Sequence, residues 1–364
     1  MNGFEKKNNP YTLQFSFVPP QFIERREITS DIVDNFIRDL PTYRGMFITG
    51  VRGSGKTVLL GDIRNRIGES KEWITVDVNP ESDILKSLAS SLYLIPQLKA
   101  LFVEARLDFS LLGIGVHIDN ASLMASTEED AINMMLQALT KHHKKLLITI
   151  DEVTYNKDIA KFSHAMSSFA SAGYDVYVLM TGLKENINAI KNESSLTFLY
   201  RAKVEELDRL NLITIKNSYK KVMKLDDDIA SELAHISAGY SLAFQALGFH
   251  YWNEMCCTQD DDDVDMDVVL DELDATLSEL AYDKIWSELS CNDRQILIAM
   301  SSLRQAEEPI KVDSIRKAIG MTSNTFTTYR NRLIEKGIVD GSDYGHLSFK
   351  LPRFWVFVDM MARG

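Results

Sequence analysis

The sequence contains the run Gly50-Val51-Arg52-Gly53-Ser54-Gly55-Lys56-Thr57, which matches the pattern G-x-x-x-x-G-K-[ST] at every defined position. In this pattern the glycines let the backbone curl until successive N–H groups point at phosphate oxygens. Lys56 adds a mobile positive charge for the β- and γ-phosphates, and Thr57 offers a hydroxyl to Mg²⁺. The run, together with Val58, is therefore expected to bind the phosphates of a nucleoside triphosphate.

The residues on either side of the run have the order that such a loop requires. Gly45–Thr49 is a short apolar segment typical of a buried strand. After the loop, apolar residues recur at helical spacing, at Val58, Leu59, Leu60, Ile63 and Ile67. The sequence thus predicts a strand, a loop and a helix in succession; a glycine-rich turn without a ligand is the alternative.

A second, acidic motif indicates the reaction. The apolar run Leu146–Ile150 is typical of a buried strand, and it ends in Asp151-Glu152. An aspartate in this position is expected to hold the Mg²⁺ shell, and the next carboxylate is expected to polarise a water for attack on the γ-phosphate. The pair favours hydrolysis over transfer, with an acidic pair that merely solvates a strand end as the alternative.

Two more strands complete an alternating pattern of strands and helices. Trp73–Val78 has strand character, and Ile84, Leu85, Leu88 and Leu92 follow it on one face of a helix. Asp175–Leu179 is a further strand, which finishes at Met180-Thr181-Gly182. This alternation predicts an α/β fold with a largely parallel sheet covered on both faces. Thr181 is then expected at the carboxyl edge of the sheet, where such folds bind ligands.

Composition limits the possible classes of protein. A chain of 364 residues with 45% hydrophobic content is expected to form two or three domains. The net charge of −12 excludes a general polyanion binder, so any contact with nucleic acid must be local. The three cysteines have neither a disulfide pattern nor metal-ligand spacing. Because no apolar stretch approaches ~20 residues and no signal peptide is recognisable, we expect a cytoplasmic protein without membrane contact.

Two local segments carry weaker expectations. Ser30 is predicted to cap a helix whose apolar face contains Ile32, Val33, Phe36, Ile37 and Leu40. The segment 108–118, in which small hydrophobic residues and glycines are frequent, is predicted to form an inserted hairpin. Its function is not evident, and decoration of a sheet edge is the simplest interpretation.

From Asn211 onward the pattern is helical. Apolar positions of a predicted helical lid are Ile229, Leu233, Ile236, Leu242, Phe244, Leu247 and Trp252. The acidic run Asp260–Asp263, which continues through Asp265 and Asp267, is expected to be solvated and to mark a boundary. Leucines spaced by three and four then predict a connecting helix, at Leu270, Leu273, Leu277 and Leu280.

The last part of the chain predicts three helices followed by a hairpin, as in a winged-helix domain. Ser323 is expected to cap the third helix, which buries Phe326, Tyr329 and Leu333 and directs Thr325, Thr328 and Arg332 outward. The hairpin is predicted from Ile338–Asp340 and His346–Lys350. Residues 311–353 contain eight Lys or Arg against four Asp or Glu. We therefore expect Thr325, Thr328, Arg332 and Lys350 to contact double-stranded DNA, although such domains also bind proteins.

Taken together, the phosphate loop, the Asp-Glu strand and the strand that ends in Thr181 resemble the AAA+ ATPases. The whole chain resembles bacterial members of the origin-recognition and STAND-like branches, with a core, a helical lid and a C-terminal winged helix. The resemblance implies ATP and Mg²⁺ as cofactors and a polar sensor at Thr181. It also implies a phosphate-reaching arginine at Arg201, in some members across a subunit interface, and a segment Pro19–Arg25 whose Arg25 lies near adenine.

The chain departs from the family pattern at two places. Glu24 replaces the usual glycine before Arg25, and Gly239–Gln245 lacks the arginine that the lid usually offers to the γ-phosphate. The second departure predicts slow turnover and a weaker link between lid and nucleotide. The expected organisation is an N-terminal segment (1–18), an AAA+ core (19–208), a helical lid (209–258), an acidic linker with a connecting helix (259–289) and a winged-helix domain (290–364).

Three hypotheses for the function follow. In the first, the chain is an ATPase switch that binds ATP and ADP and whose hydrolysis is coupled to double-stranded DNA. In the second, it is a DNA-binding regulator that uses ATP only as a ligand. In the third, it is a STAND-like signalling or defence regulator whose winged helix binds a protein and whose ATP is hydrolysed slowly. All three allow a homo-oligomer or a protein partner.

Overall fold

The computed structural model describes residues 8–14, 18–114, 121, 123–257, 264–305 and 309–363. Contacts between residues divide the chain into two compact units. The first, here called the sheet unit, consists of Arg25–Thr49 and Lys56–Glu206. The second, the helical unit, contains the described residues up to Glu24, the loop Gly50–Gly55, and the described residues from Leu207 onward. The predicted domain boundaries remain predictions, whereas this division follows the contacts.

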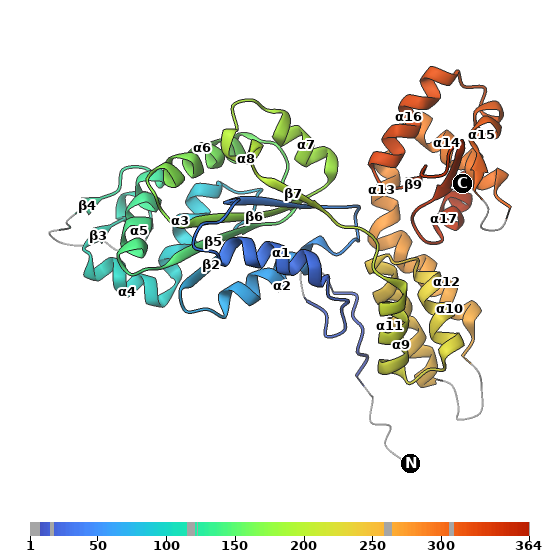
Figure 1. Ribbon diagram of the computed structural model, residues 1–364, viewed down its shortest axis with the longest axis horizontal. Helices are drawn as coiled ribbons and strands as arrows, with labels where there is room; N and C mark the ends of the chain where they lie inside the picture. The colour runs from blue at the N-terminus through green and yellow to red at the C-terminus, as the bar shows by residue number, and fades with distance from the viewer. Residues whose placement is uncertain are drawn as a thin grey trace, which may run out of the picture. The chain divides into compact units, whose positions relative to one another are not determined.

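Five parallel strands form the centre of the sheet unit (Figure 1). Their order is β2-β5-β6-β1-β7. The strand that follows the Asp-Glu strand in the chain therefore lies between that strand and the strand before the phosphate loop. The strands are β1 (Gly45–Thr49), β2 (Trp73–Asp77), β5 (Lys145–Ile150), β6 (Val176–Gly182) and β7 (Lys203–Glu206).

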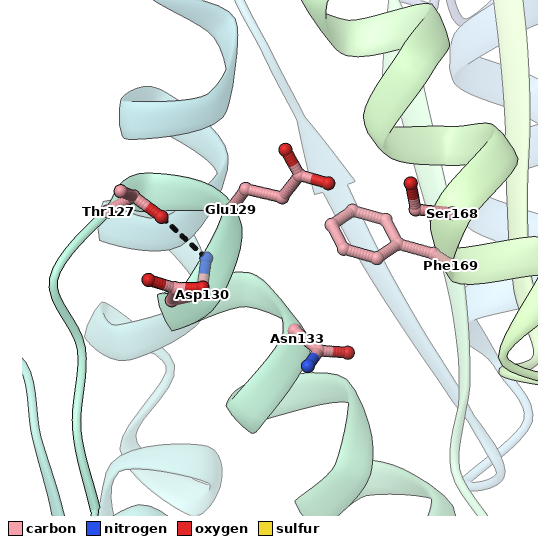
Figure 2. A pocket seen from close by; sticks show the side chains of 6 residues that line it. All are labelled: Thr127, Glu129, Asp130, Asn133, Ser168 and Phe169. Atoms are coloured by element: carbon pink, nitrogen blue, oxygen red, sulfur yellow. Dashed lines mark hydrogen bonds between the residues drawn. The ribbon is translucent and has the colours of Figure 1, made fainter.

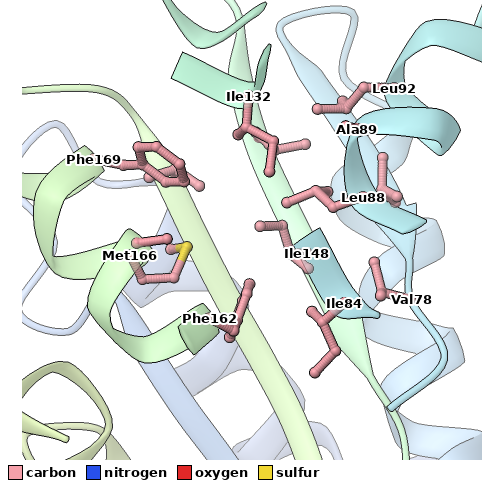
Figure 3. Close-up of a cluster of buried hydrophobic side chains, with 14 of the residues drawn as sticks. Val78, Ile84, Leu88, Ala89, Leu92, Ile132, Ile148, Phe162, Met166 and Phe169 are labelled. Carbon is pink, nitrogen blue, oxygen red and sulfur yellow. The ribbon is translucent and has the colours of Figure 1, made fainter. Parts of the chain in front are cut away.

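Helices cover both faces of this sheet (Figure 1). On one face lie α1 (Arg26–Ile37) and α2 (Lys56–Gly68). The other face carries α3 (Ile84–Leu94), α5 (Glu128–Lys141), α6 (Lys157–Ser171), α7 (Lys184–Asn192) and the short α8 (Thr197–Tyr200); α4 (Pro96–Glu104) packs on α3 and α5. The apolar positions predicted for α3 are largely those that it buries, and Figure 3 shows Ile84 and Leu88 near Ile148 of β5, in one cluster with Leu92 and with Phe162 of α6.

Two sequence predictions in the sheet unit are wrong. The helix predicted to begin after Ser30 already begins at Arg26, because the N–H of Thr29 donates to the carbonyl of Arg25 at 2.8 Å and adds a turn. Leu40 lies beyond the end of that helix and is 89% exposed.

The inserted segment also differs from a hairpin. Its described part contains a 3₁₀ turn, Ser110–Leu112, between the short strands β3 (Leu107–Asp108) and β4 (Leu123–Met124), which pair in parallel. Residues 115–118 of the predicted hairpin lie outside the described residues.

The helical character predicted from Asn211 onward is confirmed. The side chain of Asn211 caps α9 by accepting the N–H groups of Ile213 and Thr214. The core of these helices includes the ring of Tyr11, which contacts Tyr219 and Phe244. The helices are α9 (Leu212–Met223), α10 (Asp227–Ser237), α11 (Ser241–Cys257), α12 (Met266–Leu277), a π-helical turn (Ser278–Tyr282) and α13 (Asp283–Ser287). The acidic run Asp260–Asp263 lies outside the described residues.

The C-terminal part of the helical unit has the predicted order of three helices and a hairpin. A short strand before the second helix and a final helix were not predicted, and the strands form an antiparallel sheet in the order β8-β10-β9. The cap of the third helix is Thr322 instead of Ser323, because the hydroxyl of Thr322 accepts the N–H of Thr325. The elements are α14 (Cys291–Leu303), β8 (Ile310–Lys311), α15 (Val312–Ala318), α16 (Ser323–Glu335), β9 (Val339–Asp340), β10 (His346–Phe349) and α17 (Phe354–Arg363).

Candidate nucleotide-phosphate site

Thr57 and Asp151 meet in the sheet unit. Asp151 follows the last residue of β5, and Thr57 lies in the first turn of α2. The hydroxyl of Thr57 donates a hydrogen bond to Asp151 Oδ2 at 2.7 Å. The structure therefore brings together the two residues that the sequence assigns to Mg²⁺, although 94 positions separate them in the chain.

Thr181 holds both acidic residues in place. Its side chain is fully buried. The hydroxyl donates to Asp151 Oδ1 and accepts the backbone N–H of Glu152 at 3.0 Å. The sequence predicts a polar sensor at Thr181, and in the structure its hydroxyl contacts the carboxylate of Asp151 and the backbone of Glu152. Its chemical effect is thus to orient Asp151 and Glu152.

The backbone of Glu152 has an unusual conformation. Its φ is 54°, in the left-handed region that residues with a Cβ seldom adopt. Two acceptors fix its N–H, Thr181 Oγ1 at 3.0 Å and Asp151 Oδ1 at 3.1 Å. The next N–H, of Val153, donates to the carbonyl of Thr181 at 2.8 Å. These hydrogen bonds therefore maintain a backbone conformation that is unfavourable for glutamate.

The phosphate loop needs its glycines. Gly53 and Gly55 have φ values of 77° and 91°, which favour glycine. Lys56 is the first residue of α2 and is only 8% exposed. A buried lysine beside a helix N-terminus and a glycine-rich bend form an electropositive environment suited to phosphate oxygens.

The residues present fit Mg²⁺ and a nucleotide. The cation prefers oxygen ligands from carboxylates and phosphates. Thr57 and Asp151 present such oxygens side by side at 2.7 Å. Within the described parts of the chain there is no cluster of three or more His, Cys, Asp or Glu residues that could hold a metal ion alone. A sparse protein donor set completed by phosphate oxygens is typical of Mg²⁺ in nucleotide sites.

Sequence reasoning missed a second polar group at the ends of the strands. Asp77 ends β2 and accepts a hydrogen bond from the hydroxyl of Thr149 on β5 at 2.7 Å. Arg64 of α2 forms an ion pair with Asp77 at 3.3 Å. The available signal was a threonine inside an otherwise apolar strand, which in a buried position requires a partner. The group ties α2 to β2 and to β5, the strand that precedes the acidic pair.

A second group that was missed contacts the loop itself. Tyr240, Ser241 and Leu242 precede or begin α11, and all three donate hydrogen bonds to backbone carbonyls of the loop. The sequence showed only the absence of an arginine here, since hydroxyls that bind backbone have no spacing pattern.

Arg201 lies apart from the acidic pair in its own chain. It directly follows α8, two residues before β7 begins, and Lys203 of β7 pairs with Met46 of β1. Because the strands are parallel, Arg201 precedes the amino end of β7, whereas Asp151 follows the carboxyl end of β5. Its side chain is exposed and forms no ion pair with the described residues. Arg25 is the residue before α1, in the same unit.

Of the residues predicted to contact DNA, Thr325 and Thr328 lie exposed on α16, and Lys350 follows β10 with a partly exposed side chain. Arg332 differs from the prediction. Its Nε donates to Asp293 Oδ1 at 3.1 Å and its Nη2 to Ser290 Oγ at 2.5 Å. Asp293 is 1% exposed and caps α14 together with Ser290. A nearly buried carboxylate needs a positive partner, which explains why Arg332 is directed into its own domain.

A pocket elsewhere in the sheet unit contains none of the predicted site residues. It has a volume of about 220 Å³ and lies between the start of α5 and the end of α6 (Figure 2). Two of its lining residues, Glu129 and Asp130, are acidic. Carboxylates repel phosphate, so this pocket is unsuited to a nucleotide.

Comparisons with known proteins address the fold. Residues 279–358 match a family described as a domain of unknown function (DUF8462). No curated protein matches the chain. The Walker-type ATPase PABY2304 of Pyrococcus abyssi is similar in structure, with a TM-score of 0.61 and 14% identity over 93% of this chain and 96% of that one. The ORC2 protein of Aeropyrum pernix, solved as ADPNP-ADP complexes, has a TM-score of 0.61 and 13% identity over 96% of both chains.

These likenesses show the fold. The chain shares the α/β fold of this Walker-type ATPase and of the ORC2 protein, with a central parallel sheet and a largely helical C-terminal part. Among the described helices, none has both the length and the apolar character that a bilayer crossing requires.

Proposed function

We propose that this chain binds ATP and Mg²⁺ and hydrolyses ATP to ADP and phosphate. The observation that carries the proposal is the hydrogen bond of 2.7 Å between Thr57 and Asp151, which joins the first turn after the phosphate loop to the Asp-Glu strand. When bound, Mg²⁺ neutralises charge that develops on the phosphate oxygens. Thr57 and Asp151 hold it, Lys56 attracts the phosphates, and the loop Gly50–Gly55 offers backbone N–H groups.

Glu152 is the proposed general base. Its carboxylate accepts a proton from a water as that water attacks the γ-phosphorus, and the bond to the oxygen bridging to ADP breaks. Thr181 acts on this step indirectly, because its hydroxyl fixes the backbone N–H of Glu152 and the carboxylate of Asp151. The residues of the chemical step are therefore supported by one buried side chain.

Two variants test binding and chemistry separately. Lys56→Ala is expected to abolish tight binding of ATP, because the phosphates lose their main cation. Glu152→Gln is expected to retain binding and lose turnover, because an amide accepts no proton. Equilibrium binding of fluorescent ATP and release of inorganic phosphate are the measurements. Equal rates of phosphate release in wild type and Glu152→Gln would contradict the assignment of the base.

The C-terminal helices and hairpin are proposed to form a winged helix that binds double-stranded DNA in a nucleotide-dependent manner. Two features support this: Thr325 and Thr328 are exposed on the third helix, and residues 311–353 carry an excess of positive residues in an acidic chain. Lys350, which follows β10 and is partly exposed, is proposed to contact a phosphate. Arg332 has no part in this proposal, since it pairs with Asp293.

A gel-shift titration at two salt concentrations, with and without ATP, tests this second step. DNA binding by phosphate contacts is expected to weaken steeply as salt rises and to change with ATP. Negligible affinity at moderate salt would contradict DNA binding and favour the STAND-like hypothesis, in which the same surface binds a protein.

Oligomerisation is a further proposal. Because Arg201 lies at the amino end of β7, away from the acidic pair of its own chain, it suits a contact with the nucleotide of a second subunit better than a contact within the chain. Sedimentation in the presence of ATP and Mg²⁺ would show association, which Arg201→Ala should weaken.

A further inference from the structure

Three consecutive residues bind three consecutive carbonyls of the phosphate loop. The hydroxyl of Tyr240 donates to the carbonyl of Arg52 at 2.5 Å. The N–H of Leu242 donates to the carbonyl of Gly53 at 3.1 Å. The hydroxyl of Ser241 donates to the carbonyl of Ser54 at 2.8 Å. We call Tyr240–Leu242 the loop-binding turn.

These contacts determine which way the loop's N–H groups point. In a trans peptide, the carbonyl of one residue and the N–H of the next point in opposite directions. With the carbonyls of Arg52, Gly53 and Ser54 directed at the loop-binding turn, the N–H groups of the following residues are directed away from it. The N–H of Ser54 closes a turn onto the carbonyl of Val51 at 3.2 Å. The N–H groups of Gly53 and Gly55 therefore lie on the opposite side of the loop, as a phosphate-binding loop requires.

Where the loop packs on the loop-binding turn, the loop has room only for glycine, and the turn provides side-chain hydroxyls. A Cβ at Gly53 would collide with the hydroxyl of Tyr240, and a Cβ at Gly55 would come within 3.3 Å of Ser241 Oγ. The turn is itself anchored, because the carbonyl of Gly239 accepts the N–H of Leu210 at 2.7 Å. Burial raises the pKa of the Tyr240 phenol well above its usual value, so the group remains a donor at any physiological pH.

We infer that Tyr240 and Ser241 are positioning residues that hold the phosphate loop in its binding conformation by fixing its carbonyl face. This inference rests on the proposed function and adds a role for the lid where the sequence shows no arginine. A lid arginine would act by charge on the γ-phosphate and would favour ATP over ADP. The loop-binding turn acts by hydrogen bonds to backbone, so its effect is the same for both nucleotides.

The test uses the full chain with Tyr240→Phe and Ser241→Ala. Each change removes one hydrogen bond to a loop carbonyl, and each is expected to raise the Kd for Mg·ADP and the KM for ATP roughly tenfold, the factor that corresponds to one such hydrogen bond. The value of kcat is expected to stay within about twofold of wild type, because the acidic pair and Thr181 are unchanged. Ser241→Thr, which keeps the hydroxyl, should restore binding.

Tyr219→Phe is the matched control. Tyr219 is fully buried in the same group of helices, and its hydroxyl donates to the carbonyl of Phe244 at 2.8 Å. Its removal therefore has a similar effect on folding, seen in the melting temperature, but no contact with the loop. Kd and KM should remain at the wild-type values.

The outcomes separate the two proposals. If wild type binds Mg·ADP with an affinity that Lys56→Ala abolishes, but Tyr240→Phe and Ser241→Ala bind as tightly as wild type, the positioning role is refuted and nucleotide binding stands. A loss of affinity in Tyr219→Phe as large as in Tyr240→Phe also refutes the role, because the effect is then one of general stability. Absence of binding by wild type refutes nucleotide binding, and the positioning role with it.

Discussion

At the scale of single residues, the site depends on one fully buried threonine. Through one hydroxyl, Thr181 contacts the carboxylate of Asp151 and the backbone N–H of Glu152. Glu152 is at the same time forced into a left-handed conformation, with a φ of 54°. Such a conformation costs a residue with a Cβ about 1–2 kcal/mol, and it persists only where surrounding bonds maintain it.

This strain leads to a prediction for Glu152→Gly. Glycine adopts the left-handed region without penalty, so the free energy of unfolding of the variant is expected to rise by about 1 kcal/mol. Its ATPase activity is expected to be lost. Denaturant unfolding and phosphate release measure the two effects. Lys224→Gly is the control, because Lys224 has a φ of 58° at the end of α9 and should gain stability without loss of activity. A destabilised Glu152→Gly would show that the backbone at this position is not strained.

At the scale of elements, an ion pair between Arg332 and Asp293 fixes α16 to α14, although Arg332 was predicted from the sequence to contact DNA. Arg332 reaches across to Asp293 and Ser290 at the start of α14. Asp293 is nearly buried and already caps its own helix. Deletion of the arginine leaves that carboxylate without its positive partner, and the free-energy penalty of an unpaired buried charge is large.

We therefore predict that Arg332→Ala lowers the free energy of unfolding by about 2–3 kcal/mol, less than for a fully buried pair because Arg332 is itself partly exposed. Lys317→Ala, at an exposed position on α15, should change it by less than about 0.5 kcal/mol. Chemical denaturation of both variants is the measurement. An Arg332→Ala protein as stable as Lys317→Ala would restore Arg332 as a candidate for DNA contact.

At the scale of the whole molecule, the phosphate loop also contacts the C-terminal part of the helical unit. Gly337 follows α16 with a φ of 69°, and a Cβ at this position would collide with Val51 of the loop. Both residues belong to the same compact unit. The phosphate loop is thus in contact with the residues that follow α16, the helix that is proposed to bind DNA.

A double-mutant cycle tests this contact. Gly337→Ala is expected to destabilise the protein by about 1 kcal/mol from its backbone conformation and further from the collision with Val51. Adding Val51→Ala should remove the destabilisation that comes from the collision, so the effects of the two changes on stability should differ from additivity by about 1 kcal/mol. Gly320→Ala measures the penalty of the backbone conformation alone, since Gly320 has a φ of 62° and nothing within 4 Å of its Cβ position. Strict additivity of Gly337→Ala and Val51→Ala would rule out the contact.

Much of the fold could be predicted from local patterns. Gly45–Thr49 matches β1, and the Leu146–Ile150 run matches β5 apart from one residue. Buried parallel strands are continuous apolar runs, and the residue types at their ends remain visible in the sequence. The short strand β8 was missed because it consists of only Ile310–Lys311 and depends on its partner β10.

The sequence by itself determined the phosphate loop, the acidic pair, and the order of strands and helices, because each depends on residue types within a few positions of one another. Only the tertiary structure decided the long-range contacts. Thr181 binds the carboxylate of Asp151 and the backbone of Glu152, and Arg332 pairs with Asp293. Arg201 precedes the amino end of β7, whereas the acidic pair follows the carboxyl end of β5, and Tyr240 and Ser241 bind the phosphate loop. Hydroxyls and guanidinium groups bind whatever partner the fold brings within about 3 Å, and no local pattern records that partner.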